Sequence, residues 1–414
     1  MTELEKQGAA AKAASRILST AGTAKKNVAL LAIADELEAR QDEILTANAL
    51  DMEAGREKGM RDALLDRLKL TKERIAGMAK GVREVAVLPD PIGQVTKMST
   101  RPNGLIIGKK RVPLGVIGII YEARPNVTVD AAALCLKSGN AVILRGGKEA
   151  FHSNNALCGM MRDALKKAGL PEDCVSLVQD ITRQSANEMM ALTGYLDVLI
   201  PRGGAGLIRA VVENAKVPVI ETGVGNCHVY VDKDADLAMG ASIIENAKCS
   251  RPSVCNAAET LLVHRAVAEE FLPMAATELA HSHVELRGCP ETCAILPEAK
   301  TATEEDWDTE YGDYILAVKV VGSAEEAMEH IARHGSGHSE AIVTGNYFTA
   351  QKFLNEVDAA AVYVNASTRF TDGGEFGLGA EIGISTQKMH ARGPMGVEEL
   401  TSCKYIIYGE GQVR

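Results

Sequence analysis

Between residues 114 and 221 the sequence alternates short apolar runs with stretches of helical pattern. The apolar runs lie at 114–121, 140–145, 174–179, 196–201 and 217–221, and the helical patterns lie at 127–138, 153–168, 183–193 and 204–215. Short, nearly continuous apolar strands separated by helices are typical of βαβ units, in which helices cover both faces of a parallel sheet. This alternation predicts an α/β fold that begins with a Rossmann-type, nucleotide-binding unit.

A second α/β alternation follows Asp232. Its strands are expected at 259–263, 292–296, 315–321, 340–344 and 361–365, with helices between them. Residues 4–86 have the three- and four-residue apolar spacing of amphipathic helices. Because 414 residues exceed one ordinary core, we predict a cofactor domain over 1–222 and a catalytic domain over 223–395.

Two further segments look too short to bury a face by themselves. Residues 92–112 alternate around Asn103-Gly104, a strong hairpin signal, and Ser402–Tyr408 has the pattern of one last strand. We predict that the hairpin and the C-terminal segment 396–414 form a small β element that pairs across a subunit boundary, so the protein is expected to be a homo-oligomer.

The composition argues against several classes of partner. A net charge of −10 without a lysine-rich block disfavours nucleic acid and anionic membranes. No apolar run approaches membrane-spanning length, and the first residues lack the pattern of a signal peptide. Nine scattered cysteines indicate reduced thiols and a cytoplasmic location. Their spacing, like that of the histidines, fits no tetrahedral metal site.

The strongest catalytic signal runs from Glu221 to Cys255. An apolar run ends in the glutamate and is followed by glycines, and Cys255 lies between small and polar residues. A thiolate is a strong nucleophile, and a carboxylate near it can move protons. The alternative is that Cys255 is a core cysteine, the role expected for its neighbour Cys249.

From about residue 90 to 408 the chain resembles the aldehyde dehydrogenase superfamily. Residues 113–119 are similar to that family's first cofactor strand, and 141–148 to its second strand and the basic turn after it. Within the superfamily, 321–340 and 376–395 resemble the gamma-glutamyl phosphate reductases. This resemblance implies an NADPH-dependent enzyme of proline biosynthesis, which reduces gamma-glutamyl phosphate to glutamate 5-semialdehyde and releases phosphate.

The same resemblance implies three catalytic roles. Cys255 would attack the acyl phosphate and form a thioester. Asn126 falls on the family's oxyanion-hole asparagine, a donor worth on the order of 3 kcal/mol. Glu221 matches the family's glutamate, which in hydrolytic members activates water. In a reductase, water would waste the thioester, so Glu221 either assists proton transfer at the thiol or holds the loop.

Five residues are expected at the cofactor. Gly203 and Gly204 match the family's glycine turn under the pyrophosphate, and Glu310 matches a glutamate on the nicotinamide ribose. The usual G-x-G-x-x-G fingerprint is missing after the first strand. Arg145 and Lys148 stand where the family has Lys-Pro-Ser-Glu. Two cations and no glutamate favour a 2′-phosphate, and therefore NADPH over NADH.

The α-carboxylate and α-amine of the substrate also need partners. Arg124 could bind the carboxylate through two hydrogen bonds, and Arg251 could bind substrate or stabilise the thiolate. His338, Arg369 and Glu381 lie in the family-specific stretches and are further candidates. For Arg251 the alternative is a salt-bridged surface arginine, and for His338, Arg369 and Glu381 it is a purely structural role.

Two other functions compete with the reductase. The first is a hydrolytic, NAD(P)-dependent aldehyde dehydrogenase that uses Glu221 as its base. The second is a non-catalytic nucleotide-binding protein in which every cysteine belongs to the core. If the protein is a reductase, glutamate 5-kinase is a candidate partner, because it could pass on the labile acyl phosphate directly.

Overall fold

The computed structural model describes residues 1–414, apart from the side chain of Ala63, and it divides into two compact units. Unit 1 contains Met1–Thr222, Gly377–Gly383 and Met395–Arg414, and unit 2 contains Gly223–Phe376 and Ile384–Pro394. The catalytic domain predicted over 223–395 therefore loses 377–383 and Met395 to unit 1. These segments pack on unit 1, because a Cβ at Gly379 would lie 3.1 Å from Leu88 and one at Gly383 would lie 2.7 Å from Thr222. They are joined to each other by backbone pairing, in which Ile382 donates to Met395 and Met395 donates to Gly383.

The sheet of unit 1 has four parallel strands in the order β5-β4-β3-β6. Its strands and their helices are β3 (Val116–Tyr121), α6 (Pro125–Lys137), β4 (Ala141–Arg145), η1 (Lys148–Ala150), α7 (Phe151–Lys167), η2 (Glu172–Cys174), β5 (Val175–Leu177), α8 (Arg183–Met190), β6 (Val198–Arg202) and α9 (Ala205–Asn214). The predicted Rossmann-type α/β fold is confirmed. The run 217–221 is not a full strand. It makes one bridge, from Val219 to Leu199, beside Pro218, which has no N–H to donate.

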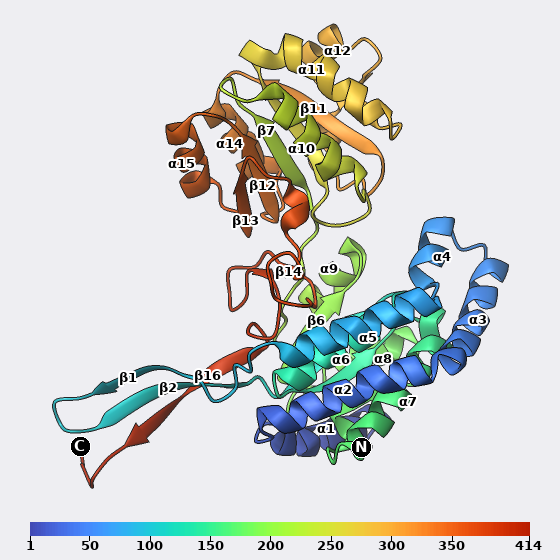
Figure 1. Cartoon of the computed structure of the whole chain (residues 1–414), viewed down its shortest axis with the longest axis vertical. Coiled ribbons are helices and arrows are strands. Elements are labelled where there is room, and N and C mark those ends of the chain that lie inside the picture. Colours follow the sequence, from blue (N-terminus) through green and yellow to red (C-terminus); the bar gives the residue numbers. More distant parts are fainter. The chain divides into compact units, whose positions relative to one another are not determined.

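Five helices precede this sheet (Figure 1). They are α1 (Glu3–Leu18), α2 (Thr23–Ala39), α3 (Gln41–Glu57), α4 (Asp62–Leu68) and α5 (Lys72–Val87). Leu4 and Ala11 of α1 pack against Val116 and Ile143 on one face of the sheet. Helices α2, α3 and α5 pack against α6 and α7. The amphipathic helices predicted for residues 4–86 thus pack on the sheet and on the helices that cover it.

A three-stranded antiparallel sheet forms a separate arm of unit 1 (Figure 1). It consists of β1 (Val95–Thr100), β2 (Ile106–Pro113) and β16 (Thr401–Tyr408), in the order β1-β2-β16. The turn between β1 and β2 contains Gly104, whose φ of +88° suits glycine. The C-terminal strand joins the hairpin through β2 and leaves β1 and β16 as the two edges of the arm.

Unit 2 contains a seven-stranded parallel sheet in the order β10-β9-β11-β8-β7-β12-β13. Its elements are β7 (Cys227–Val231), α10 (Leu237–Cys249), β8 (Ala258–His264), α11 (Arg265–Ala280), β9 (Glu285–Gly288), α12 (Pro290–Ile295), β10 (Lys300–Thr301), α13 (Glu304–Trp307), β11 (Ile315–Val321), α14 (Ala324–His334), β12 (Ser339–Val343), α15 (Tyr347–Glu356), β13 (Ala361–Val364) and η3 (Thr368–Phe370). Helices α10 and α11 pack on one face of the sheet, and α14 and α15 pack on the other. A two-stranded pairing of β14 (Ile384–Ser385) with β15 (Gly393–Pro394) completes the unit.

Strands β9 and β10 of unit 2 were not predicted from the sequence, and the structure differs from the expectations in two further places. The run 292–296, predicted as a strand, lies mostly in α12, because Pro290 occupies the first turn of that helix after Cys289 as N-cap. Strand β7 was not predicted. It carries His228 and Tyr230 at buried positions, which weakens the apolar pattern expected of a central strand.

Helices long and apolar enough to span a membrane do not occur among the described residues. Across the same residues, no group of three or more His, Cys, Asp or Glu side chains is arranged to hold a metal ion.

Candidate active site

Cys255 lies in the loop 250–257 between α10 and β8, which we call the nucleophile loop. All nine cysteines are free thiols, and in the described chain Cys255, Cys293 and Cys403 are the three that are not buried. Burial raises the pKa of the Cys249 thiol and, well above its usual value, that of Cys227. A buried thiol with a raised pKa is a poor nucleophile at neutral pH, which favours Cys255 over these two neighbours.

The chain entering β7 supports the nucleophile loop from one side. A Cβ at Gly225 would lie 1.6 Å from the carbonyl oxygen of Cys255, so only glycine fits there. The Sγ of Cys227 donates to the same carbonyl oxygen at 3.2 Å. Both contacts are to the backbone of Cys255 and not to its thiol.

The segment 367–371 holds the loop from another side. The Asn256 side chain donates to the carbonyl oxygens of Arg369 (3.3 Å) and Thr371 (3.0 Å). The Thr368 hydroxyl donates to the carbonyl oxygen of Asn256 at 2.7 Å. Arg369 Nε donates to the Ser250 hydroxyl at 3.0 Å, and Arg369 Nη1 donates to the Asn256 side chain. These hydrogen bonds fix the loop residues on both sides of Cys255.

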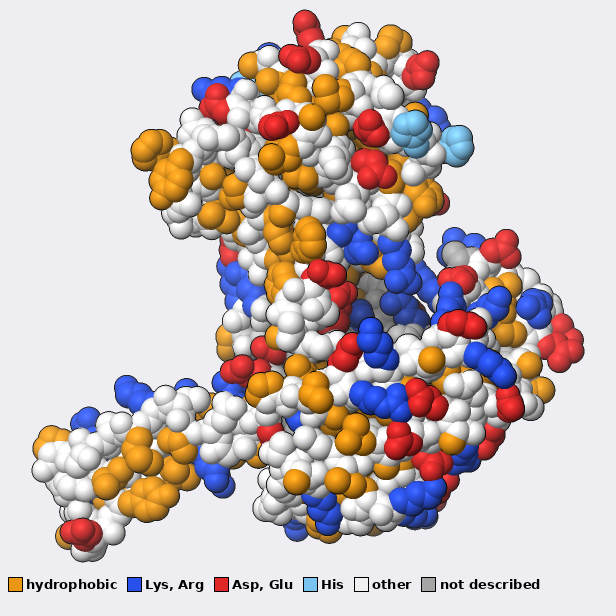
Figure 2. Space-filling view, viewed as in Figure 1, with side chains coloured by type: hydrophobic (Ala, Val, Ile, Leu, Met, Phe, Trp, Pro, Cys, Tyr) orange, Lys and Arg blue, Asp and Glu red, His pale blue; other side chains and the backbone are white. Residues whose placement is uncertain are grey.

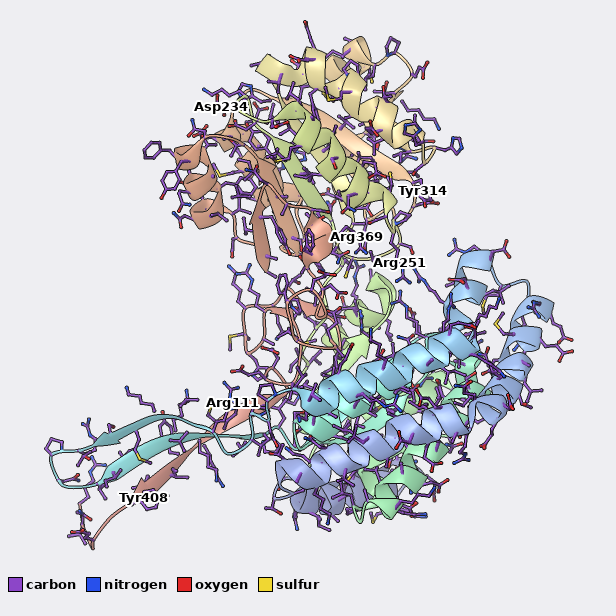
Figure 3. The ribbon with its side chains drawn as sticks, viewed as in Figure 1. Arg111, Asp234, Arg251, Tyr314, Arg369 and Tyr408 are labelled. Carbon is purple, nitrogen blue, oxygen red and sulfur yellow. The ribbon has the colours of Figure 1, made fainter. Side chains whose placement is uncertain are left out.

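Two arginines give the loop a positive environment. Burial and the nearby charge of Arg251 lower the pKa of Arg369, and the charges of Asp372 and Cys255 oppose this shift. The charges of Arg251 and Cys255 thus both act on Arg369, and Figure 3 shows both arginines on the same side of unit 2. Positive charge stabilises a thiolate and attracts an anionic substrate.

His338 does not reach the surface. Its side chain is 0% exposed, with Nδ1 2.8 Å from the Ser339 hydroxyl and 3.7 Å from the Sγ of Cys227. Ser339 Oγ is in turn 2.6 Å from Thr371 Oγ1. This buried network connects the two segments that hold the nucleophile loop. The expectation that His338 contacts substrate is thus corrected, because a fully buried side chain supports the loop from behind.

Glu310 is exposed in the loop that leads into β11. The nucleophile loop leads into β8, which is the parallel neighbour of β11, so both loops lie at the same edge of the sheet. Burial raises the pKa of Glu259, the second residue of β8, and the charge of Glu310 adds to this shift. Unit 2 thus brings Cys255, Arg251, Arg369 and Glu310 to one edge.

Four of the five predicted cofactor residues, Arg145, Lys148, Gly203 and Gly204, lie at the carboxyl ends of the unit 1 strands. The chain runs from β3 outward to β4 and β5 and then returns to β6 on the other side of β3, which makes the carboxyl ends of β3 and β6 a topological switch point. Open α/β sheets bind their ligands at such points. Gly203 and Gly204 follow β6 directly, and Gly146 and Gly147 follow β4.

The glycines after β4 and β6 form a tightly packed cradle. A Cβ at Gly146 would lie 2.2 Å from Asn154 Nδ2, and one at Gly203 would lie 2.7 Å from the Glu122 carboxyl carbon. A Cβ at Gly147 would lie 2.6 Å from an oxygen of its neighbour Glu149 and 3.3 Å from the Glu122 carbonyl carbon. The bare backbone of these turns fits the close approach that a dinucleotide phosphate requires.

The two predicted cations differ in their contacts. Lys148 is exposed at the start of η1. The Arg145 guanidinium instead donates to the carbonyl oxygens of Ile181 (3.0 Å) and Thr182 (2.8 Å). Lys148 is therefore available for a phosphate, whereas Arg145 holds the loop between β5 and α8.

Glu122 is a site residue that the sequence interpretation missed. Its carboxylate accepts a hydrogen bond from the Gly204 N–H at 2.9 Å, at the N-terminus of α9. An anion stabilises a helix N-terminus, so a phosphate that reaches this N–H must displace Glu122. The signal was available, because an acidic residue directly follows the first apolar strand.

Two of the remaining candidates of unit 1, Arg124 and Asn126, lie at the start of α6. Asn126 is exposed in the first turn, and its Nδ2 donates to Asp130 Oδ2 at 3.0 Å. Burial raises the pKa of Asp130 to about 6. Arg124 is the N-cap of the helix and is half-buried, as are Glu221 and Glu381. The predicted catalytic residues Asn126 and Glu221 thus belong to unit 1, and Cys255 belongs to unit 2.

Asp130→Asn is expected to change how stability depends on pH. Because the pKa of Asp130 is raised to about 6, the folded protein keeps this proton between about pH 4 and pH 6, where the unfolded chain has lost it. The free energy of unfolding of the wild-type protein should therefore fall by up to about 3 kcal/mol as pH rises through this window. Urea titrations at both pH values should show the asparagine variant gaining relative stability. Parallel pH profiles for the two proteins would contradict the assignment.

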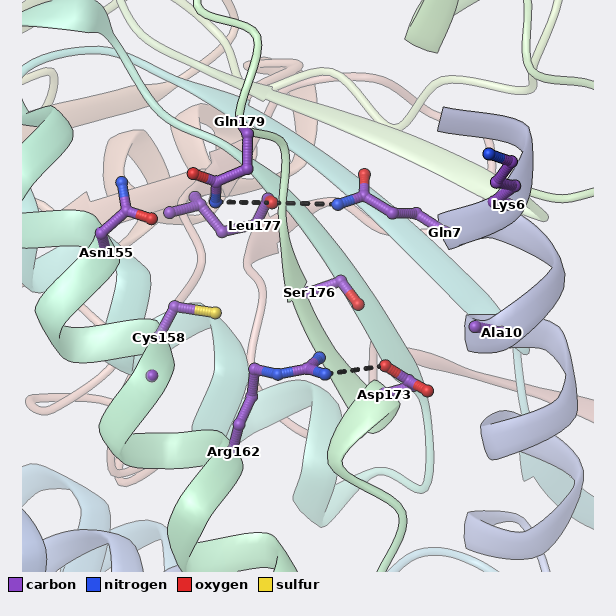
Figure 4. Close-up of a pocket in the computed structure, with 11 residues that line it drawn as sticks. Lys6, Gln7, Ala10, Asn155, Cys158, Arg162, Asp173, Ser176, Leu177 and Gln179 are labelled. Carbon is purple, nitrogen blue, oxygen red and sulfur yellow. Dashed lines mark hydrogen bonds and ion pairs between the residues drawn. The ribbon is translucent and has the colours of Figure 1, made fainter. Parts of the chain in front are cut away.

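A cavity of about 420 Å³ lies elsewhere in unit 1, between α1, α7 and β5 (Figure 4). Gln7 and Gln179 both donate to the carbonyl oxygen of Leu177 there, and Arg162 donates to that of Val175 and pairs with Asp173. These side chains thus supply hydrogen bonds to backbone carbonyl oxygens of β5, which is an edge strand of the sheet. None of the predicted site residues lines this cavity.

Comparison with known proteins gives consistent results over the whole chain. The family model described as the aldehyde dehydrogenase family matches residues 2–292. A gamma-glutamyl phosphate reductase of Moorella thermoacetica is 65% identical over 412 residues, which covers 100% of this chain and 99% of that protein. The crystal structure of the gamma-glutamyl phosphate reductase from Thermotoga maritima superposes with a TM-score of 0.97 at 52% identity, with 100% of each chain covered. The corresponding structure from Saccharomyces cerevisiae is 31% identical, with a TM-score of 0.56 and coverage of 100% and 99%.

Proposed function

The chain belongs to the gamma-glutamyl phosphate reductases of the aldehyde dehydrogenase family, and on this premise we propose how its residues divide the reaction among them. The enzyme reduces L-gamma-glutamyl 5-phosphate to L-glutamate 5-semialdehyde and phosphate with NADPH, a step of proline biosynthesis. The observation that carries the site assignment is the nucleophile loop, whose backbone is fastened from two sides around the half-buried Cys255.

We propose that unit 1 holds the cofactor at the carboxyl ends of β3, β4 and β6. The glycine turns at 146–147 and 203–204 would receive its phosphates on bare backbone, and Lys148 would pair with the 2′-phosphate. Glu310 of unit 2 is assigned to the nicotinamide ribose. When bound, NADPH supplies the hydride that the reduction needs.

Cys255 forms and breaks the covalent bond to the substrate. Its thiolate sulfur attacks the acyl carbon of the substrate, the C–O bond to phosphate breaks, and phosphate leaves with the electron pair. The resulting thioester holds the acyl group until it is reduced. As the aldehyde forms, the C–S bond breaks and the sulfur is again a thiolate. Arg369 lies within electrostatic range of this sulfur and Arg251 within range of Arg369, so both are assigned to stabilising the thiolate before and after the reaction.

Negative charge develops on the carbonyl oxygen of the substrate in both halves of the reaction. We assign the Asn126 amide and the Cys255 backbone N–H as its donors, each worth about 3 kcal/mol. Asp130 accepts one N–H of the Asn126 amide, which orients the side chain and leaves its second N–H for the oxyanion. Glu221 is assigned to proton transfer at the thiol or to support of its own loop, because a base directed at water would destroy the thioester.

The substrate's own carboxylate requires a cation. Arg124 in unit 1 and the Arg251–Arg369 pair in unit 2 are the candidates. Of these, Arg369 already donates to Ser250 and Asn256, so it contributes charge while it holds the loop. Arg251 is exposed and has the reach to bind a carboxylate through two hydrogen bonds.

An assay in the reverse direction separates the reductase from the hydrolytic aldehyde dehydrogenase. The purified protein is mixed with glutamate 5-semialdehyde and NADP, with and without inorganic phosphate, and NADPH formation is followed. A reductase needs phosphate to release the acyl group from Cys255, so sustained NADPH formation should depend on phosphate. A rate that is the same without phosphate would mean that water releases the acyl group, and it would overturn the proposal.

We further propose that the arm of unit 1 pairs with a second copy of the chain. Tyr405, Ile407 and Tyr408 of β16 are 57–68% exposed, and Met98 of β1 is 52% exposed. The register places Tyr408 and Met98 on one face of the arm and Tyr405 and Ile407 on the other, so both faces carry apolar side chains. Figure 2 shows hydrophobic side chains gathered on the face of the arm that is turned to the viewer. A three-stranded sheet with two apolar faces and two open edges is unstable alone in water.

Replacing Tyr405 and Ile407 by lysine is expected to convert the oligomer into monomers, because two buried charges would oppose the pairing. Size-exclusion chromatography with light scattering measures the mass of each species. Phe348→Lys is the matched control, since Phe348 is 81% exposed on α15 of unit 2. The control should keep the wild-type mass. An unchanged mass for the double variant would exclude the arm as the interface.

Two finer assignments follow from the chemistry of the substrate and the state of the thiols. Because an acyl phosphate is labile, we propose a transient contact with glutamate 5-kinase that shortens its exposure to water.

All nine cysteines are free thiols, which supports a reducing, cytoplasmic location.

A further inference from the structure

A buried ion pair closes the base of the nucleophile loop. Lys248 is the next-to-last residue of α10, and Glu259 is the second residue of β8, so they lie on either side of 250–257. Their Nζ and Oε2 atoms are 2.6 Å apart, and the side chains are 0% and 1% exposed. This pair fixes the distance between the two ends of the loop that carries Cys255.

The same pair reaches the loop that carries Glu310. The second oxygen of Glu259, Oε1, accepts a hydrogen bond from the Gly312 N–H at 3.0 Å. Lys248 Nζ lies 5.9 Å from the centre of the Tyr311 ring. Glu259 therefore holds the end of the nucleophile loop with one oxygen and the backbone two residues after Glu310 with the other.

We propose that Lys248 and Glu259 are positioning residues, whose ion pair holds the Cys255 loop and the Glu310 loop as one rigid piece. This inference rests on the proposed roles of Cys255 as nucleophile and Glu310 as cofactor ligand. A displacement of about 1 Å between reacting groups can cost on the order of 100-fold in rate. A link between the two loops would keep the thiol in register with the cofactor ribose.

Stability alone does not account for this pair. Burial raises the pKa of Glu259 to about 7 and lowers that of Lys248, so the interior opposes the charged form of both side chains. Well-packed apolar residues in place of a buried ion pair are often as stable or more so. What such residues cannot supply is the hydrogen bond to the Gly312 N–H.

The double variant Lys248→Met/Glu259→Leu separates positioning from stability. It removes both charges and keeps apolar volume, so the chain should fold with a Tm near that of the wild-type protein. We expect kcat and the rate of Cys255 alkylation by iodoacetamide to fall about tenfold or more. Amide hydrogen exchange should accelerate together in 250–257 and 309–313. Wild-type kcat, alkylation and exchange in the folded double variant would overturn the proposal.

Lys26→Met is the matched control. Lys26 pairs with Asp90 in unit 1 at 2.7 Å, with side chains 1% and 7% exposed, so it tests the loss of a similar buried charge far along the chain from Cys255. It should lower Tm and leave kcat, alkylation and exchange in both loops unchanged. If the double variant affected only Tm, as this control does, the Lys248–Glu259 pair would be merely structural. The exchange measurement does not depend on turnover, so it remains decisive even if Cys255→Ala proves active and the nucleophile itself is reassigned.

Discussion

Cys255→Ser is expected to abolish nearly all reductase activity while leaving NADPH affinity close to that of the wild-type protein. A serine hydroxyl is far less ionised than a thiol at neutral pH, and the ester it would form accepts hydride less readily than a thioester. The variant should retain its NADPH affinity because the cofactor contacts are assigned to the glycine turns and Lys148. Steady-state assays and a fluorescence titration with NADPH measure the two effects separately.

Cys249→Ala is the control for this prediction. Cys249 is buried, and burial raises the pKa of its thiol, so its removal should cost stability and little activity. Among the three cysteines that are not buried, Cys255 should react first with iodoacetamide, since Cys293 donates to nearby carbonyl oxygens and Cys403 lies in the arm. If Cys249→Ala were inactive and Cys255→Ala active, the mechanism would have to be rebuilt on Cys249.

Lys148→Glu is expected to raise the KM for NADPH far more than that for NADH. The change removes a charge-assisted contact with the 2′-phosphate and adds a like charge, together roughly 2–4 kcal/mol, or about 30- to 1000-fold. NADH lacks this phosphate, so its KM should change little. The measurement is a pair of KM values for each enzyme under identical salt.

Two controls test whether Lys148 itself recognises the phosphate. Lys80→Glu makes the same charge change on α5, where the lysine side chain is 79% exposed, and it should affect the two cofactors equally little. Arg145→Ala should weaken both cofactors alike, because Arg145 holds the carbonyl groups of Ile181 and Thr182. Equal weakening of NADPH and NADH by Lys148→Glu would show that Lys148 does not recognise the 2′-phosphate.

Sequence periodicity was sufficient for the fold because the parallel strands are short apolar runs with helices between them. It failed where local chemistry changed the pattern. Pro290 begins a helix where an apolar run had predicted a strand. His228 and Tyr230 interrupt the apolar pattern of β7, so this central strand was not predicted. The segment 377–383 belongs to unit 1 and not to its expected domain, because it packs against Leu88 and Arg202, which are far away in sequence and which periodicity does not register.

For the candidate site, sequence patterns point only to the proposed direct participants, whose roles stay predictions. Cys255 and the glycine turns stand in recognisable local contexts. The residues that support the nucleophile loop do not stand in such contexts, because the role of each depends on a partner far along the chain or on burial. Gly225 is required by the Cys255 carbonyl oxygen, and Lys248 and Glu259 are charged residues of the kind that sequence patterns assign to solvent.

The most direct test of the mechanism is to trap the acyl-enzyme. The protein is incubated with glutamate 5-semialdehyde and NADP without phosphate, so that the thioester accumulates, and the modified residue is located by peptide mass spectrometry. The mechanism predicts one acyl group on Cys255 that inorganic phosphate removes. An active enzyme whose acyl group lies on another residue, or that never carries one, would contradict it.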